Sequence, residues 1–194
     1  MTRNATDLRV RSWQRLRYLD PEKILRGLRE IASSHPLHQL PIEVAQLRTR
    51  ELRPYGEGRQ AALLCYGLSQ MLGGPVSFAQ HATSDYDVVA RFLLDDAVHY
   101  VPVQLKELVS AALNPRASLQ AELDKISKYV DSKDLVVAVH LNTARRLVFS
   151  DLKFPYGIVR ELWFFGALSP DQSRWVILGN MLGPSPQVLE FSYP

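Results

Sequence analysis

The segment "DLVVAVHL", residues 134–141, constrains the fold more than any other stretch because its apolar run is uninterrupted. A strand with one face in water alternates apolar and polar residues, whereas a continuous apolar run is typical of a strand covered on both faces. Residues 59–72, "RQAALLCYGLSQML", are apolar on nearly every side and predict a buried helix that ends at Gly73-Gly74-Pro75. Together these two segments indicate an α/β fold.

The order of the remaining elements refines this prediction. Residues 75–82, "PVSFAQHA", predict a short strand, and residues 85–94 and 97–108 predict the arms of a β-hairpin around Asp95-Asp96. Residues 117–132 predict an amphipathic helix whose apolar positions recur at helical spacing: Leu119, Leu123, Ile126 and Val130. Residues 57–141 therefore predict helix, three strands, helix, strand.

The two ends of the chain extend this core. Residues 8–19 and 20–33 predict helices, the second with Asp20 as its N-cap. Residues 161–169 and 173–182 predict a further hairpin with Pro170-Asp171 in its turn. We expect a single domain over residues 1–194, composed of a basic helical extension (1–54), a core (55–141) and C-terminal strands (142–194).

Composition excludes some classes of protein. The chain has 194 residues, of which 46% are hydrophobic, and no apolar run reaches the roughly 20 residues of a membrane span. Its one cysteine, Cys65, allows neither an internal disulfide nor a cysteine-built zinc site. No signal-peptide pattern is present at the N-terminus, so we expect a cytoplasmic protein with no membrane partner.

The net charge of +3 is unevenly distributed along the chain. Residues 1–60 hold 12 Lys and Arg against 7 Asp and Glu, a net +5, whereas the remaining residues are slightly acidic. A basic front end permits contact with nucleic-acid phosphates. The same pattern also fits an ordinary solvated helical face, and charge alone does not separate these readings.

The hairpin "DYDVVARFLLDDAVHYVPVQLKEL", residues 85–108, carries charged and polar residues at the ends of both arms. A turn centred on Asp95-Asp96 places Asp87 opposite Gln104 and Asp85 opposite Lys106. Because Asp-Asp lacks the glycine of tight turns, we expect a four-residue loop with the same pairing. Pro102 would shift this pairing by one residue if it produced a β-bulge.

The pattern "YDVVA", a turn, then "VPVQLK" resembles the PD-(D/E)XK nuclease superfamily, particularly its Holliday-junction-resolvase-like members. The resemblance covers residues 57–141 and implies a restriction-endonuclease-like core with the order αβββαβ and a mixed sheet. It implies that Asp87 binds a metal ion, that Lys106 is the catalytic lysine, and that Gln104 stands where most members have an acid. Glu57 is a weaker match to an acid on the first helix, and Asp85 is a possible accessory residue.

The implied activity is Mg²⁺- or Mn²⁺-dependent endonucleolytic cleavage of nucleic acid, with DNA the expected substrate. Gln104 offers a carbonyl oxygen to a hard cation but no negative charge, so metal affinity should be lower than with glutamate. An inactive nuclease-fold protein that binds nucleic acid or another protein is therefore an alternative. Asp87 and Lys106 also have a simpler interpretation. Asp87 would be a residue that begins a strand, and Lys106 would be a surface lysine that favours solubility.

The aromatic segment "ELWFFGALSPDQSRWVILGNML", residues 161–182, has two interpretations. It predicts core strands, because large apolar residues recur along both of its arms. A homodimer interface is the alternative, and it would suit an enzyme that cleaves two strands. His81, on the first predicted strand, is a candidate neighbour of the Asp87 cluster, although nothing in the sequence requires it to be one.

Overall fold

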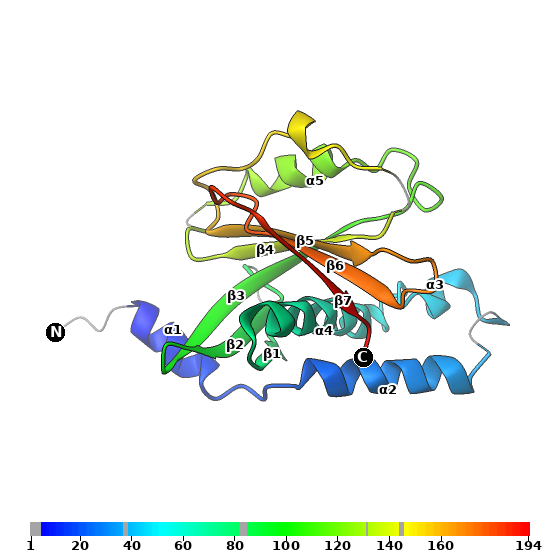
Figure 1. The fold of residues 1–194 in the computed structure, drawn as a ribbon, viewed down its shortest axis with the longest axis horizontal. Coiled ribbons are helices and arrows are strands. Elements are labelled where there is room, and N and C mark those ends of the chain that lie inside the picture. The colour runs from blue at the N-terminus through cyan, green and yellow to red at the C-terminus, as the bar shows by residue number, and fades with distance from the viewer. Residues whose placement is uncertain (1–4, 37–38, 82–84, 131, 144–145) are drawn as a thin grey trace. The chain divides into compact units, whose positions relative to one another are not determined.

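A computed structural model describes residues 5–36, 39–81, 85–130, 132–143 and 146–194. The protein is α/β, with a mixed seven-stranded sheet in the order β1-β2-β3-β4-β5-β6-β7 (Figure 1). The chain divides into two compact units, unit 1 (Met1–Pro102) and unit 2 (Val103–Pro194). Among the described residues, no helix has the length and apolar character needed to cross a membrane.

The described residues of unit 1 form four α-helices and the first strands of the sheet. The helices are α1 (Ala5–Trp13), α2 (Pro21–Ser34), α3 (Ile42–Ala45) and α4 (Arg53–Leu72). The strands are β1 (Val76–Gln80), β2 (Val88–Leu94) and the first part of β3 (Ala97–Leu108). Helix α2 packs against α4, and α4 packs against β1. Strands β1 and β2 are antiparallel, with Phe78 opposite Ala90.

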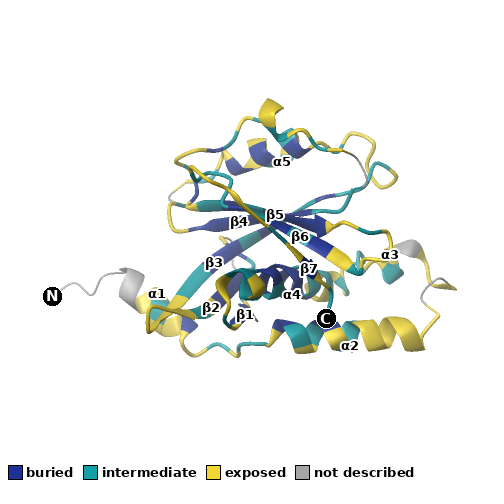
Figure 2. Ribbon diagram, viewed as in Figure 1, coloured by how far each residue is buried: buried dark blue, intermediate teal, exposed yellow. Residues whose placement is uncertain are grey.

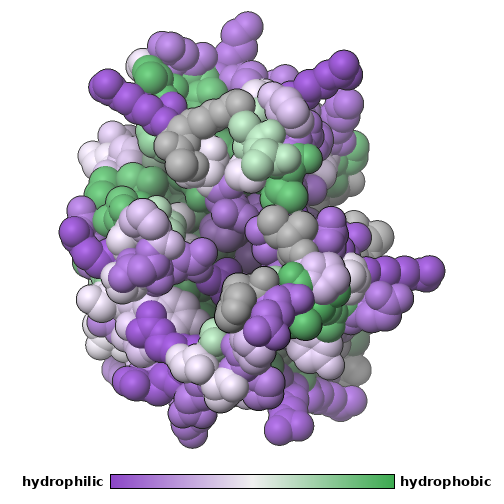
Figure 3. Space-filling view, turned by 90° about the vertical axis from the view of Figure 1, so that its right-hand side faces the viewer, coloured by the Kyte–Doolittle hydropathy of each residue, from purple (hydrophilic) through white to green (hydrophobic). Residues whose placement is uncertain are grey.

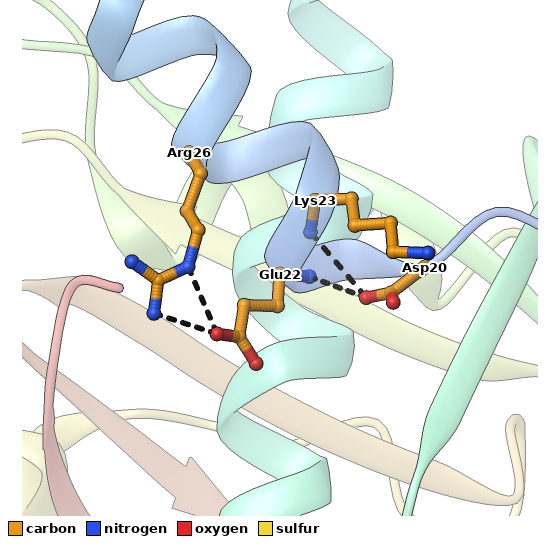
Figure 4. A network of polar contacts seen from close by, with 4 residues as sticks. All are labelled: Asp20, Glu22, Lys23 and Arg26. Carbon is orange, nitrogen blue, oxygen red and sulfur yellow. Dashed lines mark hydrogen bonds and ion pairs between the residues drawn. The ribbon is translucent and has the colours of Figure 1, made fainter.

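Helix α2 begins where its sequence predicts. The Asp20 side chain accepts hydrogen bonds from the backbone N–H groups of Glu22 (3.0 Å) and Lys23 (3.4 Å), which satisfies donors that have no partner within the helix (Figure 4). One turn later, Arg26 pairs with Glu22 at 2.7 Å. The predicted N-cap is therefore confirmed. Leu25 is fully buried, while most of the other residues of α2 remain exposed or half-buried (Figure 2).

Helix α4 is buried along its centre, as the sequence predicts. Five consecutive residues, 61–65, are at most 1% exposed. The helix ends at Gly73, which adopts the left-handed conformation (φ 65°) and donates its N–H to the Ser69 carbonyl. Its start differs from the prediction, because the helix begins at Arg53 rather than at residue 59.

Two other predicted helices are shorter than expected. Helix α1 ends at Trp13 rather than continuing to residue 19, and its last turn is closed by the Gln14 N–H donating to the Val10 carbonyl. In unit 2, α5 (Leu119–Ile126) ends before Val130, which is 81% exposed. Leu119, Leu123 and Ile126 are buried, so only this part of the predicted apolar face packs into the core.

Unit 2 contains the rest of β3, α5, a short 3-10 helix η2 (Phe149–Asp151) and four further strands. These strands are β4 (Val136–Leu141), β5 (Glu161–Ala167), β6 (Arg174–Gly179) and β7 (Gln187–Ser192). Strand β4 is parallel to both β3 and β5, whereas β6 is antiparallel to both β5 and β7. The sequence did not predict β7.

Strand β4 confirms the prediction from its apolar run. Residues 136–140 are all buried, so neither face of the strand meets water (Figure 2). The aromatic segment is also buried in unit 2, since Phe164, Phe165 and Trp175 are at most 1% exposed. The interpretation of residues 161–182 as core strands is confirmed. Figure 3 shows one molecular face, on which hydrophilic residues predominate and hydrophobic residues form small separate groups.

Candidate functional site

Asp87 lies immediately before β2, in unit 1. The last register pair of β1 and β2 is Gln80 with Val88, and one step further the His81 N–H donates to the Asp87 carbonyl (3.0 Å). This hydrogen bond continues the antiparallel ladder and fixes the backbone at Asp87. The Asp87 side chain is half-buried, whereas Asp85 is exposed. The end of this ladder thus holds an acid at the edge of the core.

An aromatic cluster adjoins Asp87 in unit 1 and consists of Trp13, His81 and Tyr86. The Trp13 indole Nε1 donates to the Tyr86 hydroxyl at 2.8 Å, and the two rings meet edge to face at 5.8 Å. His81 stacks on Tyr86, with ring centroids 5.7 Å apart. Since Tyr86 directly precedes Asp87, these contacts hold one chain neighbour of the candidate aspartate in place.

Sequence reasoning named His81 as a possible neighbour of Asp87 but missed Trp13 and Tyr86. The sequence did not show that β1 pairs with β2. This pairing places His81 beside Asp87. Within the described part of the chain, no hydrogen-bond partner reaches the buried Nδ1 atom of His81. The link between Trp13 and Tyr86 spans 73 residues, so no local signal could have found it.

Gln104 and Lys106 lie on β3, in unit 2. Burial alternates along the strand, with Val103 and Leu105 buried and Gln104 and Lys106 half-buried. Gln104 and Lys106 therefore share one face of the strand, as their spacing predicts. The Lys106 ammonium lies 5.5 Å from the centre of the Tyr129 ring, and Gln104 Nε2 donates to the Leu105 carbonyl at 3.3 Å.

The hairpin turn corrects one prediction. Strand β2 ends at Leu94 and β3 begins at Ala97, so the loop has two residues rather than four. Asp95 and Asp96 both adopt positive φ (49° and 60°), which a type I′ turn requires and which aspartate tolerates better than most residues. Pro102 lies within β3 and is buried.

Asp87 belongs to unit 1, whereas Gln104 and Lys106 belong to unit 2. The predicted pairing requires a turn centred on Asp95-Asp96, and the two-residue turn lies at this position. That pairing places Asp87 opposite Gln104, and it remains a prediction.

Glu57 lies in the first turns of α4 and pairs with Arg53 at 2.9 Å. This end of the helix is fixed to the end of β1, because Gln80 Nε2 donates to the Pro54 carbonyl at 2.6 Å. Gly58 adjoins the same side chain, since a Cβ added there would lie 3.3 Å from Gln80 Nε2. Glu57 is thus partly neutralised by an arginine on its own helix.

Oxygen donors of the type that Mg²⁺ prefers are present at the predicted positions, a carboxylate at Asp87 and an amide carbonyl at Gln104. A magnesium site needs few protein ligands, so this donor set fits the ion by chemical type. Among the described residues, however, no three His, Cys, Asp or Glu side chains form a group that could hold a metal ion.

A second polar group, in unit 2, involves Glu107, His140 and Asn142. Asn142 Nδ2 donates to Glu107 Oε1 at 2.7 Å, and His140 Nδ1 lies 4.0 Å from the same oxygen. His140 is 5% exposed and stacks against Phe165 (5.1 Å) and Trp175 (5.7 Å). This packing makes His140 part of the core, whereas Glu107 and Asn142 are half-buried. The parallel register of β3 and β4, which aligns Glu107 with His140, was not predicted.

A cavity of about 260 Å³ lies in unit 2, beyond the ends of β3 and β4. Its lining is largely apolar and comes from the end of β3, the start of α5 and the segment after β4, including Leu108, Leu119, Leu147 and Val148. None of the predicted site residues belongs to its described lining.

Comparisons with known proteins found no matching family model, no matching curated protein and no matching solved structure. Functional inference therefore depends on the residues and their positions alone.

Proposed function

We propose that the protein is a metal-dependent endonuclease that hydrolyses phosphodiester bonds in nucleic acid, with DNA the expected substrate. The main support is the element order α4-β1-β2-β3-α5-β4, which is the helix, three strands, helix, strand order that the nuclease resemblance implies. The sheet is mixed, as that resemblance also implies. A restriction-endonuclease-like core is part of this proposal.

The positions of three residues add to this support. Asp87 directly precedes β2, and Gln104 and Lys106 share one face of β3, which are the places that the motif assigns to its acid and to its acid-x-lysine triplet. All three side chains are half-buried, so they are accessible to a ligand yet held by the fold. Surface residues without a role would more commonly be fully exposed.

Asp87 and the Gln104 amide oxygen would hold a divalent cation. When bound, Mg²⁺ or Mn²⁺ would supply Lewis-acid polarisation of the phosphodiester and would lower the pKa of a bound water. Lys106 would place its ammonium against the negative charge that develops on the phosphate oxygens during attack. The Tyr129 ring face near the Lys106 ammonium would limit the positions which that flexible side chain samples.

The alternative is a nuclease-fold protein that binds without cleaving. Two observations favour it: Gln104 is neutral, and the described residues contain no group of three potential acidic, histidine or cysteine metal ligands. In this alternative Lys106 would contact a phosphate as a simple cation. The two functions differ in whether Lys106 supports catalysis or binding alone.

The test is to incubate the purified protein with plasmid, single-stranded and branched DNA in Mg²⁺ or Mn²⁺. We expect Lys106→Ala to lower the cleavage rate by about 10²–10³-fold, the cost of removing one transition-state donor. Lys133→Ala, which changes an exposed lysine of the same unit, should leave the rate unchanged. Cleavage that survives Lys106→Ala would refute the proposed site.

A second variant separates the nuclease from the binding protein. Gln104→Glu restores a negative charge at the predicted metal position, so we expect both Mn²⁺ affinity and cleavage to rise. Absence of cleavage by both the natural protein and Gln104→Glu would favour the binding alternative. Unchanged metal affinity in Gln104→Glu would show that position 104 is not a metal ligand.

A further inference from the structure

The N-terminal part of unit 1 contains a run of arginines that the candidate nuclease site does not use. Residues 9–18, here called the arginine segment, hold four arginines and no acid: Arg9, Arg11, Arg15 and Arg17. All four side chains are exposed. Such a density of one charge creates a positive local field.

The arginine segment is fixed to the core near its middle and directly after its C-terminal end. Near the middle, Trp13 is 2% exposed and donates to the Tyr86 hydroxyl at 2.8 Å. The Tyr18 hydroxyl donates to the Trp13 carbonyl at 3.0 Å, which closes the segment on itself. Directly after it, Leu19 exchanges backbone hydrogen bonds with Phe78 of β1. The arginines therefore project from an anchored backbone rather than from a free tail.

Arg91 on β2 adds a fifth cation beside the segment. Its guanidinium lies 4.4 Å from the centre of the Tyr18 ring, and Tyr18 in turn lies 6.0 Å from Tyr100. Burial, together with Tyr100 and despite Arg91, raises the pKa of Tyr18 to about 12. A tyrosine is neutral at neutral pH even without this shift, so Tyr18 adds no negative charge to the surface.

The anchor also places the segment beside the candidate aspartate. Tyr86, which accepts the hydrogen bond from Trp13, is the chain neighbour of Asp87. The arginine segment and the predicted metal-binding carboxylate are therefore attached to the same short stretch of unit 1. A bound polyanion held by these arginines would lie close to the residue expected to act on it.

We propose that the arginine segment, residues 9–18 together with Arg91, is the surface of unit 1 that binds the phosphate backbone of the nucleic-acid substrate. This inference deepens the proposed function, since it assigns a substrate-binding surface to the proposed nuclease. Guanidinium groups bind phosphate oxygens in bidentate geometry, and the affinity falls with salt as condensed counterions are displaced. The surface would contact phosphates rather than bases, so it would bind without sequence preference.

The test measures binding of a fluorescein-labelled 20-base-pair duplex, and of its single strand, by anisotropy in EDTA at several salt concentrations. The variant is Arg11→Gln, Arg15→Gln and Arg17→Gln combined. Arg9 is kept because its guanidinium packs 5.0 Å from the Trp13 ring centre and contributes to the fold. We expect the slope of log affinity against log salt to become shallower by about 2–3 units, close to one unit per lost phosphate contact.

The matched control removes three positive charges from exposed positions of α2 in the same unit, as Lys23→Gln, Arg26→Gln and Arg29→Gln combined. It should retain at least most of the slope and affinity. An equal loss of affinity and slope in both triple variants would show that only net charge matters, and it would overturn the proposal. An unchanged slope in the first variant would also overturn it. Circular dichroism checks that both variants fold.

Two further outcomes decide the assignment. Vesicles of anionic phospholipid serve as a second probe, and binding to them that depends on the same arginines, without binding to nucleic acid, would overturn the proposal in favour of a membrane surface. Because EDTA prevents metal-dependent cleavage, binding is scored separately from activity. A protein that never cleaves DNA but loses binding in the first variant would refute the nuclease and support the arginine surface.

Discussion

Two regions of the molecule pair a histidine with an acid, one on neighbouring strands and one directly beyond the paired ends of two strands, yet their surroundings differ. In unit 2, His140 is aligned with Glu107, is 5% exposed and is packed against Phe165 and Trp175. In unit 1, His81 donates its backbone N–H to the Asp87 carbonyl, and its ring is half-buried against Tyr86. The same pair of residue types therefore occurs once inside a core and once at its edge.

This difference in burial indicates which pair is accessible to a ligand. Glu107 already accepts a hydrogen bond from Asn142 at 2.7 Å, and its histidine is buried under two aromatic rings, so this pair belongs to a partly buried polar network. Asp87 lies directly before a strand and has a half-buried side chain, and its chain neighbour Tyr86 accepts a hydrogen bond from Trp13 of the arginine segment. We infer that the pair in unit 2 stabilises the fold and that the pair in unit 1 belongs to the functional surface.

The largest expected effect compares the two histidines directly. His140→Ala should lower the free energy of unfolding by about 2–3 kcal/mol, because it removes a buried ring that packs against Phe165 and Trp175. His81→Ala should lower it by less than about 1 kcal/mol, since His81 is half-buried. Urea denaturation measures both, and an equal or larger loss for His81→Ala would break the distinction between core and surface.

A smaller effect is expected for the anchor of the arginine segment. Tyr86→Phe keeps the ring but leaves the buried Trp13 indole N–H without its acceptor, which should cost about 1–2 kcal/mol of unfolding free energy. Tyr55→Phe, at a residue that is 65% exposed, is the control and should change stability little. Equal stability of the two variants in urea would show that the hydrogen bond between Trp13 and Tyr86 does not hold the segment.

The smallest effect belongs to the exposed turn of unit 2. Hydrogen bonds from Ser169 and Ser173 lower the pKa of Asp171 from 3.8 to about 2. A carboxyl with a lowered folded-state pKa contributes stability above its unfolded pKa and loses that contribution as the pH falls through the folded value. Asp171→Asn should therefore lower Tm slightly at neutral pH, and the difference should vanish between about pH 4 and pH 2. A Tm difference independent of pH would contradict this assignment.

Much of the fold could be predicted because burial patterns are local. The continuous apolar run of β4 and the apolar helix at residues 59–72 both indicate their surroundings without tertiary information. The start of α4 could not be predicted, because Pro54, Gly56 and Gly58 together are typical of a loop. Gly58 is explained only by the approach of Gln80 from β1, which leaves little room for a Cβ.

The candidate site was predictable in part for a related reason. Alternation along β3 places Gln104 and Lys106 on one face, and a period of two is visible in any sequence. The aromatic cluster beside Asp87 depends on contacts between residues far apart in the chain, Trp13 with Tyr86, and no periodicity reveals such contacts. The two-residue turn was missed because two aspartates with positive φ are less common than a glycine-containing turn.

The most direct test of the account is whether Asp87 and Gln104 lie opposite each other. Asp87→Cys with Gln104→Cys, in a Cys65→Ala background, should form a disulfide on mild oxidation, because a disulfide requires Cα atoms within roughly 7 Å. Ser77→Cys with Arg91→Cys, at a register pair of β1 and β2, is the positive control. Disulfide formation in both variants is the predicted result. A disulfide in the control alone would show that the carboxylate and the amide do not converge, and it would contradict the proposed metal site.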